Sequence, residues 1–164
     1  MELLGCRIAG RLSLVFPVAG PLPADVAPGC QPERPLTVVA VHGTAAPVVP
    51  FGGGQGRGLS GGARVLSARA SIGQWAQLDG CGPTPTDAAQ PNSVTDGTTV
   101  SVSTYNGCSA KATVELYTVS GGGHTWPGGE QYAPVPVVGR ASRQFDAGEL
   151  LWTLLASRPT GPYF

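Results

Sequence analysis

The sequence predicts an α/β fold, in which helices pack on the faces of a mostly parallel sheet. Two apolar runs, residues 12–18 and 36–41, lack the alternation of a half-exposed strand, which is typical of strands buried on both faces. Segments of helical character separate and follow the strands, and this order favours parallel pairing. With 164 residues the chain is long enough to form one domain with a core.

The expected elements follow one another from residue 2. Residues 2–10 are predicted to be the end of a helix that leads into strand 12–18, and five prolines mark residues 21–35 as a loop. After strand 36–41, a glycine-rich segment at 47–62 precedes a helix expected over residues 63–78. Residues 83–97 are predicted to be another turn-rich loop.

Two strands and a helix are expected in the last third of the chain. Residues 98–105 and 112–119 alternate in polarity around Asn106-Gly107, which indicates an antiparallel or extended pair. Asp146 is the predicted N-cap of the last helix, because aspartate accepts hydrogen bonds from the free N–H groups there. The apolar face expected for this helix consists of Leu150, Leu151, Leu154 and Leu155. Pro159 is expected to end it.

Composition excludes several classes of partner. The formal net charge is zero and only 12% of residues are charged, so nothing indicates nucleic-acid or acidic-lipid binding. No apolar run reaches the ~18 residues that a membrane helix needs, and we expect no membrane contact. Glu2, Arg7 and Arg11 argue against a signal peptide and leave the localisation open. The 25 glycines and 16 prolines predict many loops, but 41% hydrophobic residues argue against disorder.

The four cysteines can form two local pairs, Cys6 with Cys30 and Cys81 with Cys108. Two disulfides that close short loops suit a secreted protein. Four free thiols in a cytosolic chain are the alternative. A metal site is not expected, because neither Cys-x-x-Cys nor a paired Cys/His spacing occurs.

The most informative motif is Gly-Gly-Gly-His-Thr-Trp-Pro-Gly-Gly at residues 121–129, directly after the strand predicted at 112–119. Small residues leave the imidazole of His124 uncovered at the carboxyl end of a late strand, as in the catalytic base of α/β-hydrolases. The motif resembles the closing motif of secreted polyhydroxybutyrate depolymerases and related feruloyl-esterase-like hydrolases. The resemblance implies that His124 is the catalytic base. Cysteines also flank comparable segments in that family, which favours the two disulfides.

A second stretch, residues 36–51, resembles the strand and loop that carry the catalytic acid in this family. The family pattern is HGTADPVVPY, and the aspartate position is Ala46 in this chain. His42 matches a structural loop residue of the family. Without the acid, nothing orients the imidazole or stabilises its protonated form. Another aspartate could reach His124 by a different route, although no sequence spacing favours a particular one. The candidates are Asp25, Asp79, Asp87 and Asp96.

The nucleophile is the second element that departs from the family. The chain is expected to start just after the family's Gly-x-Ser-x-Gly elbow. A Gly-x-Ser-x-Gly match at residues 58–62 makes Ser60 a second candidate, but glycines rather than a strand precede it, so an ordinary loop serine is the alternative. The dinucleotide-type glycine pattern at 56–61 lacks a preceding strand in the same way. Trp126 is a candidate substrate-binding residue at the rim of the site, or it packs beneath its own loop.

The resemblance implies a partial α/β-hydrolase fold: a single portion of a domain over residues 1–164, with the last strands of the sheet and without the half that carries the nucleophile. It implies hydrolysis of carboxylic esters or polyesters through a serine, aspartate and histidine, with no metal or organic cofactor. Because of Ala46 and the missing elbow, we expect a truncated enzyme with weak or no activity. A non-catalytic ester- or polyester-binding module and a rewired esterase that uses Ser60 and His124 are the alternatives.

One partner beyond the substrate is expected from the predicted sheet. The strand from Leu12 to Val18 would be an apolar edge without a neighbour on one side, and such an edge favours self-association.

Overall fold

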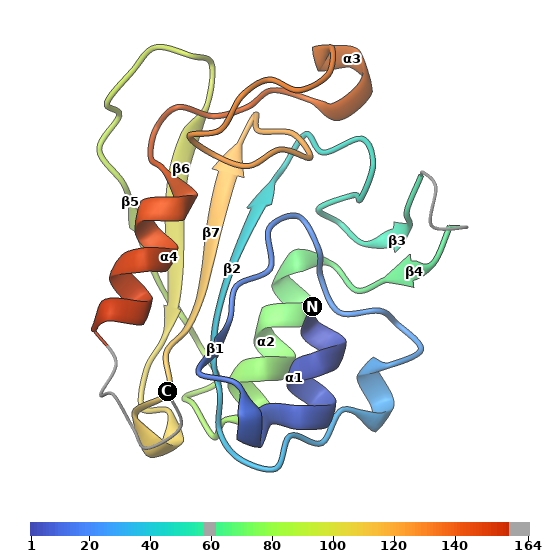
Figure 1. Ribbon diagram of the computed structural model, residues 1–164, viewed down its shortest axis with the longest axis vertical. Coiled ribbons are helices and arrows are strands. Elements are labelled where there is room, and N and C mark those ends of the chain that lie inside the picture. Colours follow the sequence, from blue (N-terminus) through green and yellow to red (C-terminus); the bar gives the residue numbers. More distant parts are fainter. Residues whose placement is uncertain (58–61, 158–164) are drawn as a thin grey trace.

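The computed structural model describes residues 1–57 and 62–157, which form a sheet with helices on both faces (Figure 1). Five strands pair in the order β1-β2-β7-β6-β5. Their bounds are β1 Leu14–Val15, β2 Thr37–Gly43, β5 Thr86–Ala89, β6 Thr99–Tyr105 and β7 Val114–Ser120. The α/β class is as predicted.

The sheet is mixed rather than mostly parallel. Strands β1, β2 and β7 run parallel, whereas β6 is antiparallel to both β7 and β5. The link between β6 and β7 is too short for a crossover and can join only antiparallel strands. The expected antiparallel pair around Asn106-Gly107 is therefore confirmed.

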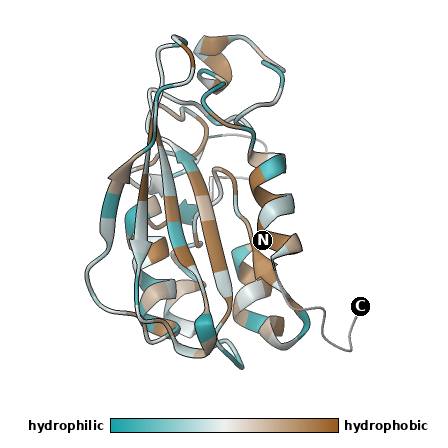
Figure 2. Ribbon diagram, turned by 90° about the vertical axis from the view of Figure 1, so that its left-hand side faces the viewer, coloured by the Kyte–Doolittle hydropathy of each residue, from teal (hydrophilic) through white to brown (hydrophobic). Residues whose placement is uncertain are grey.

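The apolar run of β2 is explained by burial on both faces. Val38 packs with Ile72 and Trp75 of α2 (Ala68–Leu78), and the next residue, Val39, packs with Ala147 of α4 (Ala147–Ala156). Successive strand residues point to opposite faces, so α2 covers one face and α4 the other. Figure 2 shows the apolar residues concentrated along these strands and the helix faces against them.

Several predicted boundaries are wrong. Most of segment 12–18 runs beside β2 without ladder pairing, and only Leu14–Val15 forms a strand, with an isolated bridge from Val18 to Val41. The helix predicted at 63–78 begins at Ala68, where the Ser67 side chain accepts a hydrogen bond from Ala70. Before it, β4 (Arg64–Val65) pairs with β3 (Gly54–Gln55) in a two-stranded ribbon.

The expected loop at 83–97 contains β5, a strand that is exposed along its whole length. It has no apolar face, so periodicity could not reveal it. Four short elements were also not predicted: the 3-10 turns at Ala9–Arg11, Ala27–Gly29 and Ser109–Lys111, and the short helix α3 (Val135–Val138). Helix α1 covers Glu2–Ile8, close to the predicted range.

Helix α4 begins as expected. The Asp146 carboxylate accepts hydrogen bonds from the backbone N–H groups of Gly148 and Glu149, which confirms it as the N-cap. Leu150, Leu151 and Leu154 pack on the core, but Leu155 is 39% exposed and does not belong to the buried face. Pro159 lies outside the described residues.

Both disulfides predicted from the sequence are present, Cys6–Cys30 and Cys81–Cys108. The first joins α1 to the loop before β2, and the second joins the end of α2 to the turn after β6. None of the helices in the described part of the chain is long and apolar enough to cross a membrane.

Candidate functional site

The candidate site lies where the parallel strands β2 and β7 end side by side. Gly43 pairs with Val119 in the register of the two strands, so the loops that follow them leave the sheet together. The loops are joined by hydrogen bonds from the Thr44 N–H to the Val119 carbonyl (2.9 Å) and from the Ala45 N–H to the Gly122 carbonyl (2.8 Å). The histidine loop and the loop of the acid position therefore form one unit.

Glycine is needed where these loops meet. A Cβ atom on Gly43 would collide with the backbone of Gly122, and one on Gly123 would collide with the backbone of Gly139. Gly121 has a positive φ of 75°, a region that glycine adopts without strain. The glycine-rich motif thus permits close backbone contact between the two loops.

His124 is held by its backbone and not by its ring. Its N–H donates to the Val138 carbonyl (2.5 Å), and the Tyr132 hydroxyl donates to its carbonyl (2.8 Å). The half-buried imidazole makes no hydrogen bond with any described residue, and its Nδ1 atom is buried. Burial lowers the pKa of His124, which favours the neutral form that can accept a proton.

Ala46 is buried in the loop that contacts the histidine loop, and it presents a methyl group where the family pattern has a carboxylate. None of the four alternative aspartates bonds to His124. Asp79 accepts a hydrogen bond from the Leu36 N–H, at the opposite end of β2. Asp87 accepts from Ser103 in the middle of β6, and Asp25 is exposed.

Asp96 is the alternative aspartate closest to the correct edge, because it precedes the start of β6 beside the end of β7. Its carboxylate is already engaged by Thr98, Arg143 and Gln144. Burial raises the pKa of Asp96, but these hydrogen bonds outweigh burial and lower it to about 2. Asp96 therefore fixes the loops around the site and does not orient His124.

Ser60 and most of the glycine pattern at 56–61 lie outside the described residues. Trp126 is partly exposed and packs on a segment outside its own loop. The side chain is 41% exposed, and its ring lies 6.1 Å from that of Phe16 between centroids. Trp126 thus packs on the segment after β1 and still faces solvent.

The segment from His124 to Gly139 exposes further apolar side chains that sequence reasoning missed. Tyr132, Val135 and Val137 are all exposed, together with Trp126. The sequence signal that could have indicated this exposed segment is the group of apolar residues interrupted by prolines at 132–138. The Gln131 side chain holds this segment together through the Ala133 and Gly139 carbonyls and the Ala141 N–H.

His42 is a second histidine at the same edge of the sheet, placed by the sequence at the end of a buried strand. It is 3% exposed, its Nδ1 lies 3.1 Å from the Gly43 carbonyl, and its ring meets Phe51 edge-on at 5.6 Å. Its Nε2 is buried without a partner among the described residues. Burial lowers the pKa of His42; the bond to Gly43 acts against this effect and the proximity of His124 adds to it.

Within residues 1–57 and 62–157, no group of three His, Cys, Asp or Glu side chains is arranged to hold a metal ion. The site is the edge of an α/β sheet at which a half-buried histidine with a lowered pKa lies in a glycine-rich loop. This arrangement is one that hydrolases use for a general base.

Comparison with known proteins agrees with this class. The chain is 28% identical over 127 residues to "Feruloyl esterase B" of Piromyces equi, a match that covers 73% of this chain and 22% of that protein. It is 31% identical over 143 residues to "Putative esterase NocK" of Nocardia uniformis subsp. tsuyamanensis, covering 82% of this chain and 41% of that protein. No protein-family model matches. The similarities support a general relationship to carboxylic ester hydrolases, and the matched region spans less than half of either relative.

Proposed function

We propose that this chain carries the histidine part of a carboxylic ester hydrolase site of the polyhydroxybutyrate depolymerase or feruloyl esterase type. The observation that carries the proposal is the His124 imidazole, which is held at the carboxyl end of β7 against the loop of Ala46, with Nδ1 buried and unpartnered. The similarity to proteins named as esterases supports the same class of reaction.

In this proposal the Nε2 atom of His124 acts as the general base. It removes the proton of a hydroxyl nucleophile as the oxygen attacks the ester carbonyl carbon, and it then donates that proton to the departing alkoxide. Water releases the acid from the acyl-enzyme in a second round of the same proton transfers. Ser60 is the candidate hydroxyl within this chain.

The same geometry predicts weak or no turnover. In the related serine-protease case, loss of the acid partner reduces kcat by about 10⁴-fold, because the imidazole loses its tautomer and its stabilised protonated form. Ala46 offers neither effect, and Asp96 is engaged elsewhere. The weak or absent activity proposed for this chain rests on this defect.

A second candidate function is binding of esters or polyesters without hydrolysis. The exposed apolar side chains beside His124 favour it, since Trp126, Tyr132, Val135 and Val137 all lie within one short segment.

The first experiment is hydrolysis of a short-chain p-nitrophenyl ester by the purified chain, beside His124→Ala, Ser60→Ala and the control Ser109→Ala. Ser109 is exposed and far from His124 in the fold. Turnover lost in the first two variants but kept in the control would identify a rewired esterase. Equal rates in all four proteins, at the level of buffer, would leave no catalytic role for His124 in this chain.

Binding is tested separately by sedimentation with polyhydroxybutyrate particles. Trp126→Ala should reduce the bound fraction severalfold if the segment after His124 binds the polymer. Trp152→Ala is the matched control, because Trp152 is 72% exposed on α4 and away from this segment. Equal binding by both variants and the unmodified chain would contradict a specific surface.

A further inference from the structure

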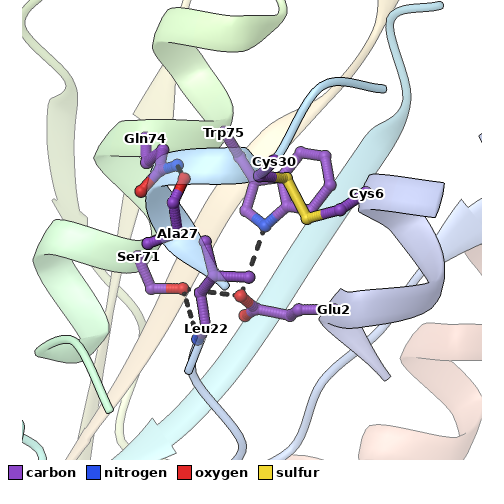
Figure 3. Close-up of a disulfide and its surroundings, with 8 residues drawn as sticks. All are labelled: Glu2, Cys6, Leu22, Ala27, Cys30, Ser71, Gln74 and Trp75. Atoms are coloured by element: carbon purple, nitrogen blue, oxygen red, sulfur yellow. Dashed lines mark hydrogen bonds between the residues drawn. A yellow bond between two sulfur atoms is a disulfide. The ribbon is translucent and has the colours of Figure 1, made fainter. Parts of the chain in front are cut away.

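A buried carboxyl group joins α1 to α2 on the face of the sheet opposite α4 (Figure 3). Glu2 is 2% exposed, and its Oε2 accepts hydrogen bonds from the Ser71 hydroxyl (2.7 Å) and the Trp75 indole N–H (3.3 Å). The Ser71 oxygen accepts in turn from the Leu22 N–H (2.9 Å). Both of these hydrogen bonds are made to Oε2, and Oε1 takes part in neither.

A small cavity of about 10 Å³ lies next to this group. Its polar lining comes from Glu2, Ser71 and His42, and the remaining lining residues are aliphatic residues, prolines and a glycine. A cavity of about this size holds one water molecule when polar groups are available to bind it. His42 supplies such a group, because its buried Nε2 has no other partner among the described residues.

We propose that one buried water in this cavity joins Glu2 Oε1 to His42 Nε2, so that the two residues share a single proton. This inference is independent of the proposed ester hydrolysis, because it rests on the cavity and its lining residues alone.

The hydrogen-bond directions along this path are consistent. His42 Nδ1 lies against the Gly43 carbonyl, which can only accept, so Nδ1 carries the hydrogen and Nε2 of the neutral ring accepts. The water donates a hydrogen bond to Nε2 and accepts one from the O–H group that Oε1 carries in the neutral carboxyl group. Oε2 already receives two donors, which suits the carbonyl oxygen of that carboxyl group. Each buried polar atom on the path then has a partner.

The charges around the path favour one proton for the pair. Burial raises the pKa of Glu2 to about 7, against the hydrogen bonds of Ser71 and Trp75 and the nearby amino group of Met1. Burial lowers the pKa of His42, and His124 is the other titratable group that acts on it. The proton therefore resides on Glu2 below about pH 7. Its transfer through the water would give a glutamate–imidazolium pair with the same net charge. As long as the proton stays on Glu2, His42 is uncharged beside His124.

The test needs no variant in its first arm. In the ¹⁵N-labelled full chain, the long-range imidazole spectrum should show His42 as the neutral tautomer with hydrogen on Nδ1, and its ¹⁵N shifts should inflect near pH 7 as Glu2 ionises. A nuclear Overhauser contact between water and the His42 Hε1 proton should be present. Absence of the contact, or the other tautomer, would overturn the proposal.

The second arm compares Glu2→Gln with Glu149→Gln, which removes the same charge from an exposed position on α4. Glu2→Gln should abolish the inflection near pH 7 at His42, lower the pKa of His42 and leave the water contact in place, because the amide can still donate to the water. The control should keep all three features. An inflection that persists in Glu2→Gln would exclude a proton shared with Glu2. If this variant does not fold, the first arm alone decides.

Discussion

Gly123 and Gly139 lie in direct backbone contact, and a Cβ atom on either residue would collide with the Cα of the other. Gly123 immediately precedes His124, and Gly139 ends α3 with a positive φ of 80°. The hydrogen bond from the His124 N–H to the Val138 carbonyl lies next to this contact. The position of the candidate base is thus fixed by two glycines and not by its own side chain.

Gly123→Ala should therefore destabilise the fold and displace His124. Forcing an extra methyl group into a closely packed site costs about 1–3 kcal/mol, and here both neighbours are backbone atoms that cannot rotate away. Urea denaturation measures the change in the free energy of unfolding. Gly52→Ala is the control, because a Cβ atom there meets nothing within 4 Å. Equal stability of the two variants would contradict the role given to this contact.

Ala46→Asp should restore a partner for His124. A carboxylate beside the imidazole stabilises its protonated form, so the pKa of His124 should rise by about 1–3 pH units from its lowered value. The measurement is an NMR titration of the His124 ring protons.

Ala45→Asp serves as the matched control for this titration, because Ala45 is exposed and solvent screens a charge at that position. A His124 titration curve that is the same in Ala46→Asp and the unmodified chain, with the fold intact, would place Ala46 away from Nδ1.

Sequence patterns predicted those elements whose side chains pack on a core. Hydrophobic patterning predicted the burial of β2 on both faces and the antiparallel pairing of β6 with β7. The helix cap at Asp146 follows from a local hydrogen bond of its side chain. The short strand β5 was missed because it is exposed along its whole length, and β6 is the strand with which it pairs. The family resemblance assigned the base to His124 and the acid position to Ala46, and the structure joins the loops of these two residues.

Other features of the site depend on contacts between distant residues. The engagement of Asp96 by Arg143 and Gln144 joins segments almost fifty positions apart, and no spacing rule predicts it. The buried position of Glu2 is similar, because its partners Ser71 and Trp75 lie on another helix. A lone acidic residue in a short amphipathic segment is usually exposed, so the burial of Glu2 could not be expected from its local pattern.

Removal of the Cys81–Cys108 disulfide should cost about 3–4 kcal/mol in the free energy of unfolding, which is the chain-entropy value for a loop of this length. The double variant Cys81→Ser/Cys108→Ser should therefore unfold at a lower denaturant concentration. The imidazole spectrum of His124 should stay unchanged, because this disulfide lies at the opposite end of the sheet. A shifted His124 spectrum would show that the two ends of the sheet are coupled.

Asp79 should make stability fall as the pH rises. Burial raises the pKa of its carboxyl group from 3.8 to about 6, the hydrogen bond from Leu36 acts against this effect, and Oδ2 is buried without a partner among the described residues. Because the folded state holds this proton more tightly than the unfolded state, its contribution is complete below pH 4 and is lost as the pH rises through 6. Glu2, with a pKa raised to about 7, acts in the same direction over a higher range.

Asp79→Asn should flatten this dependence. The variant keeps an acceptor for the Leu36 N–H but cannot ionise, so the fall in unfolding free energy between pH 4.5 and 7.5 should shrink by about 2 kcal/mol at most. Asp25→Asn, at an exposed position, should leave the fall unchanged. Denaturant titrations of the three proteins across this range measure the difference. An unaltered slope in Asp79→Asn would mean that the Asp79 carboxyl group is ionised in the fold with little penalty, for example through a water that pairs with Oδ2.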